Sequence, residues 1–376
     1  ATASSSSDVN ITLNGDTTIA GGDITASADD STLDLTITNA SGSISNMTID
    51  ANNGADTTVN ISASSDALQL FDTLHVGATN EGTAIASIND LLMGGGNIDV
   101  NASNDATVSL DIARLNGDIT NFTVAADNSI IDVTTSNNGS DDILNITNLT
   151  ATASLGSEVA ISLDGNTTFL ANGSDDADII AFADDSTLDL TITNASSSSV
   201  NNITVDANNG ADTTVNIGGA IGLTGTLHVG ADNGTATALF TELNGASGDI
   251  DVNASNDAAV SLDIATLNGE ITNFTVNADN SIIDVTTNSS LIGVSNNYSV
   301  DITNLTATAS SSSDVNITLN GDTTIAGGDI TASADDSTLN LTITNASGTA
   351  HNITLDANND ADTTLNIAGE IGRAHV

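Results

Sequence analysis

Acidic and amide side chains alternate in a seven-residue segment, Asp-Ala-Asn-Asn-Gly-Ala-Asp, that begins at Asp50 and again at Asp206. A variant of the segment, with Asp in place of Gly, begins at Asp356. Oxygen donors at alternate positions next to a turn could hold Ca²⁺, which takes six to eight oxygen ligands in proteins. The candidate metal ligands predicted by this pattern are Asp50, Asn52, Asp56, Asp206, Asn208, Asp212, Asp356, Asn358, Asp360 and Asp362.

The same segments lack the other signs of a dedicated calcium site. They have neither the Gly and Glu placement of an EF-hand loop nor the nonapeptide repeat of Ca²⁺-binding β-rolls. Solvated acidic turns are therefore the simpler interpretation, and site-bound Ca²⁺ is kept as the alternative. No other cofactor is predicted.

Histidine offers little further chemistry. His75 and His228 occupy the same position of a repeated Thr-Leu-His-Val-Gly-Ala segment, and neither has a second His or a Cys nearby in the sequence. Both are predicted to point outward as exposed substitutions in a column where Thr is usual, and His351 is placed in a loop.

An enzyme of the polysaccharide lyase or glycosidase type is the catalytic alternative. Carboxylates are abundant enough for an acid and base pair. A lyase generally needs a cation against the acidic groups of its substrate, however, and Arg114 is replaced by Thr266 in the next long repeat. No long unique insertion breaks the repeat, so no catalytic residue is predicted and the chain is expected not to be an enzyme.

An ice-binding face is a further alternative, suggested by a column of Thr. Such faces use Thr-x-Thr in nearly every turn, whereas within the seven-residue pattern that repeats along this chain only Thr150 with Thr152 and Thr306 with Thr308 fit it. An exposed Thr ladder with high β-propensity is the simpler interpretation.

A seven-residue pattern typified by Phe122 to Asn128 (FTVAADN) positions all these side chains. Its first apolar residue, the anchor, recurs at a mean interval of about 25 residues, and Ala follows four residues later in 14 of 14 copies. Asn or Asp precedes the anchor in 12 of 14 copies and recurs six residues after it in 12 of 14. The anchors are Ile24, Met47, Leu74, Ile98, Phe122, Leu149, Ile179, Ile203, Leu227, Ile250, Phe274, Leu305, Ile330 and Ile353.

Within one repeat the apolar residues alternate with polar ones, which indicates β-strands. Phe122, Val124 and Ala126 are expected to point inward, and Thr123 and Ala125 outward. One repeat buries too few aliphatic side chains to fold alone, so repeats must stack. The sequence predicts an all-β parallel β-solenoid of about 14–15 turns with about 25 residues per turn. A rise of about 4.8 Å per turn makes this a rod of roughly 65–70 Å.

The Asn and Asp residues before the anchor and six residues after it are expected at the corners of the turn, as at Asp127 and Asn128. Asn before the anchor is also expected to form hydrogen-bonded ladders along the axis and to tolerate a left-handed corner. A tandem array of β-sandwiches is the other architecture considered. An unbroken Ala column is hard to place in a sandwich, which normally keeps an aromatic core residue.

Composition limits the partners. The chain has a formal net charge of −47, no Cys, no Pro and only 2% aromatic residues. Such a charge argues against nucleic acid and anionic membranes, and favours cations as partners. No apolar run reaches the length of a membrane span, so no membrane insertion is predicted.

A longer repeat of about 153 residues divides the chain into 31–185, 186–336 and 337–369, and residues 1–30 are identical to 307–336. Residues 1–369 are predicted to form a single continuous solenoid that belongs to a longer protein. Residues 370–376 (EIGRAHV) match nothing else in the chain and read as the translation of a sequencing adapter, so they are expected to be an artefact.

The Asn-flanked turns, the bias to Asp, Asn, Thr, Ser and Gly, and the nested duplications resemble bacterial beta-strand-repeat surface proteins. These are similar to filamentous haemagglutinin-like and autotransporter-passenger adhesins. The resemblance implies a right-handed β-helix, export to the cell surface or the extracellular space, and a structural or adhesive stalk. A host surface, a matrix or a polysaccharide is then the expected partner. A Ca²⁺-dependent adhesin and an ice- or carbohydrate-binding solenoid remain the alternatives.

Overall fold

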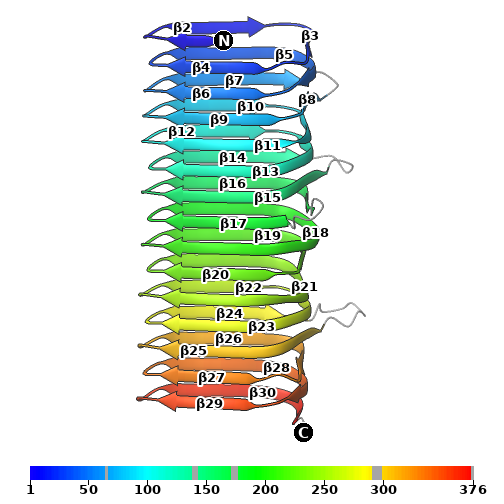
Figure 1. The fold of residues 1–376 in the computed structure, drawn as a ribbon, viewed down its shortest axis with the longest axis vertical. Helices are drawn as coiled ribbons and strands as arrows, with labels where there is room; N and C mark the ends of the chain where they lie inside the picture. Colours follow the sequence, from blue (N-terminus) through cyan, green and yellow to red (C-terminus); the bar gives the residue numbers. More distant parts are fainter. Residues whose placement is uncertain (64–66, 138–142, 171–176, 290–298, 374–376) are drawn as a thin grey trace. The chain divides into compact units, whose positions relative to one another are not determined.

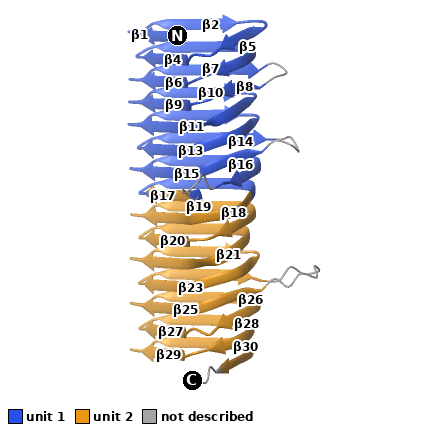
Figure 2. Cartoon of the chain, turned by 45° about the vertical axis from the view of Figure 1, so that its right-hand side comes forward, with its two compact units in different colours: residues 1–178, 184–195 blue, residues 179–183, 196–376 orange. Residues whose placement is uncertain are grey.

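The computed structural model describes residues 1–63, 67–137, 143–170, 177–289 and 299–373. It is a parallel β-solenoid of about 14 turns with about 24 residues per turn and no helix, which confirms the predicted fold class. The chain divides into two units (Figure 2). Unit 1 comprises Ala1–Asp178 and Asp184–Ala195, and unit 2 comprises Ile179–Ala183 and Ser196–Val376.

The strands of the first half are β1 (Thr2–Ser4), β2 (Asp8–Leu13), β3 (Thr17–Ala20), β4 (Ile24–Asp29), β5 (Thr32–Ile44), β6 (Met47–Asn52), β7 (Asp56–Ala63), β8 (Leu68–Leu70), β9 (Thr73–Thr79), β10 (Thr83–Ile88), β11 (Leu91–Ser103), β12 (Thr107–Ile112), β13 (Leu115–Asp127), β14 (Ile130–Asn137), β15 (Leu144–Ser154) and β16 (Glu158–Phe169). Those of the second half are β17 (Ala177–Asp184), β18 (Thr187–Asn208), β19 (Asp212–Leu223), β20 (Thr226–Asp232), β21 (Thr235–Ser255), β22 (Ala259–Ile264), β23 (Leu267–Asp279), β24 (Ile282–Asn288), β25 (Val300–Ser310), β26 (Asp314–Ala326), β27 (Ile330–Asp335), β28 (Thr338–Ala350), β29 (Ile353–Asn358) and β30 (Asp362–Arg373).

Strands of unit 1 lie one above another in three parallel columns (Figure 1). The heptad face consists of β1, β4, β6, β9 and the last residues of β11, β13 and β15. The second face consists of β2, the first half of β5, β7, β10, β12, β14 and the first half of β16. The third face contains β3, β8 and the remaining parts of the long strands. A long strand such as β5 therefore bends from one face to the next.

The predicted alternation of inward and outward residues on the heptad face is confirmed. In β13, Phe122, Val124 and Ala126 are buried while Thr123 and Ala125 are half-buried on the outer side. Phe122 lies in register with Ile98 below and Leu149 above, so equivalent residues form continuous inner columns. The Ala four residues after the anchor is buried in every copy except Ala357. Ala357 lies in β29, which pairs through this face with β27 alone.

The Asn residues before the anchors form the predicted side-chain ladders. Asn121 Nδ2 donates to Asn97 Oδ1 over 3.0 Å, and Asn148 Nδ2 donates to Asn121 Oδ1 over 3.1 Å. In unit 2, Asn304 Nδ2 donates to Asn273 Oδ1 over 3.0 Å. Each ladder amide bonds one turn to the next, as stacked amides do in other parallel arrays.

The left-handed corner lies in one of the two columns of Asn and Asp that were expected at corners. It falls six residues after the anchor, where φ is positive in residues such as Asn53 (55°), Asn128 (48°) and Asn209 (54°), which confirms this half of the prediction. Asn and Asp tolerate this conformation because their short polar side chains bond locally. For the residues before the anchors the prediction is wrong: they are not among those with positive φ, because they lie inside, at the start of, or directly before a paired strand.

The extra residues of the longest turns lie between β7 and β8, β14 and β15, β16 and β17, and β24 and β25. The four longest anchor intervals contain residues 64–66, 138–142, 171–176 and 290–298, which lie outside the described residues. The strands on either side keep their parallel register: β7 pairs with β5 and β10, and β8 with β5 and β11. At the other end, β30 pairs with β28 as far as Arg373 and so includes part of the segment expected to be an artefact.

Candidate functional site

The outer side of the heptad face carries two clusters of charged residues with the same construction. The His75 cluster consists of Asp50, His75 and Asp99 from β6, β9 and β11, which are successive strands of unit 1. The His228 cluster consists of Asp206, His228 and Asp251 from β18, β20 and β21, in unit 2. In each cluster one imidazole lies between two carboxylates.

Both ring nitrogens of His75 have a carboxylate partner. Nε2 lies 3.2 Å from Asp50 Oδ1, and Nδ1 lies 3.0 Å from Asp99 Oδ2. In the His228 cluster the corresponding distances, to Asp206 Oδ1 and Asp251 Oδ2, are both 3.1 Å. The two imidazoles are 30% and 29% exposed, so the clusters are partly shielded from water.

Strand register explains how three turns meet at one ring. His75 lies directly beside Asp99 on the following turn, whereas Asp50 lies beside Gly77, two residues further along β9. The imidazole reaches Asp50 by leaning over Gly77. A Cβ on that glycine would lie 2.7 Å from His75 Nε2, so the absence of a side chain makes the contact possible. Gly230 leaves the same space for the His228 ring, because a Cβ on Gly230 would lie 2.6 Å from His228 Nε2.

The carboxylates stabilise the protonated rings. The hydrogen bond that His75 donates to Asp50 raises the pKa of His75, burial opposes the increase, and the bond to Asp99 adds to it. The hydrogen bonds to Asp206 and Asp251 raise the pKa of His228 to about 9 against the opposing effect of burial. At neutral pH the His228 cluster is therefore an imidazolium between two carboxylates, and the carboxylates of the His75 cluster favour the same protonated form.

An amide extends each cluster. Asn101 Nδ2 donates to Asp99 Oδ1 over 2.7 Å, and Asn253 Nδ2 donates to Asp251 Oδ2 over 2.7 Å. Beside each cluster a shallow groove runs over successive turns, because the outward side chains there are small. The groove volumes are about 500 Å³ at His75 and about 420 Å³ at His228.

The residues predicted as calcium ligands are divided among several positions. Asp50 and Asp206 are bound by the imidazoles. Asn52 Oδ1 accepts a hydrogen bond of 2.7 Å from Thr79, and Asp56 is the exposed first residue of β7, beyond the corner. Asn208 and Asp212 occupy the equivalent places in unit 2. Within the described residues no group of three or more His, Cys, Asp or Glu side chains is placed to hold a metal ion.

The third copy of the segment is more open. Asp356, Asn358, Asp360 and Asp362 are exposed or half-buried around the corner between β29 and β30, and Asp360 has a positive φ of 63°. Asp360 lines a shallow hollow together with Asp335 and Asp336. Calcium binding at these corners stays a prediction.

A scan against protein-family models found no match, and searches of curated proteins and of solved structures also found none. The function must therefore be argued from the geometry of the chain itself.

The outward direction predicted for His75 and His228 is confirmed. Their partners were not predicted, because these are carboxylates on the two neighbouring turns and not a second His or a Cys. A signal was present in the sequence: Asp99 and Asp251 follow the two histidines by one turn, and Asp50 and Asp206 precede them by one turn. The Gly two residues after each His completes that signal.

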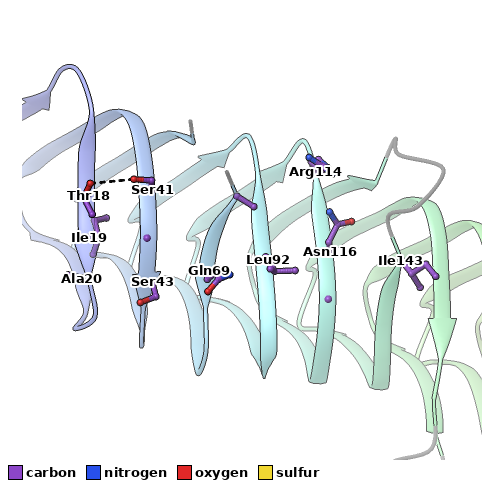
Figure 3. A pocket seen from close by; sticks show the side chains of 13 residues that line it. Thr18, Ile19, Ala20, Ser41, Ser43, Gln69, Leu92, Arg114, Asn116 and Ile143 are labelled. Carbon is purple, nitrogen blue, oxygen red and sulfur yellow. Dashed lines mark hydrogen bonds between the residues drawn. The ribbon is translucent and has the colours of Figure 1, made fainter. Parts of the chain in front are cut away.

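A second groove, of about 1070 Å³, lies on the third face of unit 1 and contains Arg114 (Figure 3). The Arg114 guanidinium is 3.1 Å from Asp90 Oδ2, and the Asp90 side chain is largely buried. Thr18, Ser41 and Gln69 contribute small polar side chains to the groove. Arg114 is the basic residue among those that line this groove, and it is paired with Asp90.

No helix long and apolar enough to cross a membrane occurs among the described residues.

Proposed function

We propose that this chain is a structural or adhesive stalk segment of an exported bacterial surface or matrix protein, and that it has no catalytic activity. The observation that supports this most directly is the equivalence of the turns. Each described turn repeats the same inner columns, and side-chain ladders join many turns to the next. An architecture of this kind provides length and a repeated outer surface.

The composition of the outer surface supports the same proposal. The outward positions carry Thr, Asn, Asp and Ser, and the two histidine clusters use substitutions within the repeat pattern without any inserted element. Enzymes built on repeat folds usually need a site that departs from the repeat. Arg114, which is replaced by Thr266 in the next long repeat, is paired with Asp90.

Small-angle X-ray scattering tests the stalk directly. We expect the purified chain to scatter as a single rod of about 65–70 Å, because stacked parallel strands rise by about 4.8 Å per turn. A compact particle, or two bodies joined by a flexible link, would contradict the proposal.

Salt dependence gives a second test. A charge of −47 over about 14 turns is about three negative charges per turn. Equivalent carboxylates about 5 Å apart repel by about 1 kcal/mol even in water. We expect the melting temperature to rise as NaCl is raised from 0.1 to 1 M, because the screening length falls from about 10 Å to about 3 Å. A melt that does not respond to salt would contradict this expectation.

A Ca²⁺-dependent adhesin is the alternative, and the same melting assay separates it from general screening. If the corners bind Ca²⁺, millimolar Ca²⁺ stabilises the folded chain beyond a NaCl control of equal ionic strength, by mass action on the native state. The variant Asp56→Asn/Asp212→Asn/Asp362→Asn should then lose the additional stabilisation. Coincident curves in the two buffers would reject specific calcium sites.

A further inference from the structure

We propose that the His75 and His228 clusters are proton-binding clasps, each of which holds three successive turns together only while its imidazole carries two protons. Binding and release of these protons then links the stability of the outer heptad face to pH in the neutral to alkaline range.

The chemistry follows from the two nitrogens of the ring. A doubly protonated imidazole donates from both nitrogens, so it can bond Asp50 on one turn and Asp99 on the turn beyond its own. A neutral imidazole has one donor and one lone pair. Loss of the proton therefore removes one of the two bonds and directs a lone pair at a half-buried carboxylate 3.0–3.2 Å away.

No nearby cation replaces that proton. The charged groups around His75 are Asp50 from β6, Asp99 from β11 and Asp127 from β13, which lines the same groove. Those around His228 are Asp206 from β18, Asp251 and Asp232 from β21 and β20, and Asp279 from β23. Every one of these groups is a carboxylate, so a neutral ring leaves their mutual repulsion uncompensated.

The same five-residue arrangement is present in both clusters. The two clusters belong to different units and lie at equivalent positions of the long repeat, and each has its His, both Asp partners, the Asn and the space-making Gly. A His that merely replaced an exposed Thr would not require the two Asp partners, the Asn or the Gly.

The sign of the pH dependence follows from the raised pKa values. A group whose pKa is higher in the folded chain stabilises it fully below the unfolded pKa, near 6.5 for His, and the stabilisation is lost as the pH rises through the folded pKa. That pKa is about 9 for His228. Both clasps should therefore stabilise the chain at pH 6.5 and below; the His228 clasp should release between about pH 6.5 and 9, and the His75 clasp should release as the pH rises above 6.5.

This window is unusually free of other titrating groups. The chain has no Cys, and its two basic residues besides His are Arg114 and Arg373, so it has no Lys. The ordinary pKa values of Asp, Glu and Arg side chains lie outside the range from pH 6.5 to 9. A pH-dependent melt in this range can therefore be assigned by substitution.

The first experiment is an NMR titration of the imidazole signals in the full chain, assigned with His75→Gln and His228→Gln, with EDTA present so that no Ca²⁺ occupies Asp50 or Asp206. His351 is exposed at the bend before β29 and lies in neither cluster, so His351→Gln is the control variant. We expect the His75 and His228 rings to stay protonated to higher pH in the folded chain than in the same chain unfolded in urea. Equal titration in the folded and the unfolded chain would overturn the proposal.

The second experiment measures the melting temperature from pH 6.5 to 9 at constant ionic strength. For the unmodified chain we expect a fall of a few degrees across this range, about 2–5 °C. The double variant His75→Gln/His228→Gln should lose most of the fall, whereas His351→Gln should keep it. An equal fall in all three proteins would reject the clasps.

Substitution of the glycines tests the geometry without removing the histidines. In Gly77→Ala/Gly230→Ala the new methyl groups displace both rings from Asp50 and Asp206, so both imidazoles should titrate at lower pH than in the unmodified chain. Unchanged titration in a folded double variant would show that the contacts to Asp50 and Asp206 are not needed for proton binding.

Discussion

Replacement of Phe122 by Ala is expected to lower the free energy of unfolding by about 3–5 kcal/mol, the usual cost of deleting a buried aromatic ring. Phe122 is completely buried and lies in register with Ile98 and Leu149 on the turns below and above. Loss of the ring leaves a cavity that faces both neighbouring turns. The backbone there is fixed by parallel strand pairing on both sides, so it cannot collapse to fill the space.

Urea denaturation followed by circular dichroism measures this change. Thr123→Ala is the matched control, because Thr123 is the next residue of β13 and points outward, and it should cost less than about 1 kcal/mol. Phe274→Ala repeats the experiment at the equivalent, fully buried position of unit 2. If Phe122→Ala and Thr123→Ala have equal small effects, the inward assignment of the anchors is wrong.

Replacement of Gly96 by Ala is expected to destabilise the chain by about 3 kcal/mol, at the upper end of the cost of overpacking. Gly96 lies at a β-bulge of β11, where the register shifts between Gly94 and Asn97. A Cβ at Gly96 would lie 1.6 Å from the carbonyl oxygen of Asp72, which already accepts a hydrogen bond from the Asn97 amide. The backbone of one turn must move away from the next, which breaks local pairing.

The adjacent Gly95 provides the control for this substitution. Gly95 has a φ of +99°, but a Cβ there would meet nothing within 4 Å. Gly95→Ala should therefore cost only the conformational strain, roughly 1–2 kcal/mol. Thermal or urea melts of the two variants should rank Gly96→Ala as clearly less stable, and the reverse order would contradict the close approach of β11 to Asp72.

The inner side of the chain was readable from the sequence because it is governed by periodicity. Alternation of Phe122, Val124 and Ala126 with Thr123 and Ala125 predicts burial without knowledge of any partner, and an Ala in every repeat indicates an inner position with little space. Stacking then follows from the inability of one turn to bury enough apolar surface. The Asn ladder before the anchors was predictable for the same reason, since identical residues meet in register.

The outer side was harder to predict, because its contacts run between turns and along diagonals. His75 meets Asp50 only through a two-residue offset and the space over Gly77, and sequence spacing alone does not specify that side-chain direction. The left-handed corner was predicted only in part. Asn occurs in two columns of the repeat, both of which were expected at corners, and only the backbone shows that the column six residues after the anchor forms the corner while the column before the anchor forms a ladder.

The matching columns of adjacent turns have a consequence for how such a gene changes. Each turn presents the same inner residues and ladder amides to the turn before it and to the turn after it, as Asn97, Asn121 and Asn148 do. A duplication or deletion of whole turns therefore joins surfaces that already fit, and leaves every remaining strand with a compatible neighbour. Insertion of a single residue within a strand instead shifts one column against the next and exposes its core side. Recombination between repeats can thus change the number of turns without disturbing the fold, whereas a change in the number of residues inside a strand disrupts its pairing and its core.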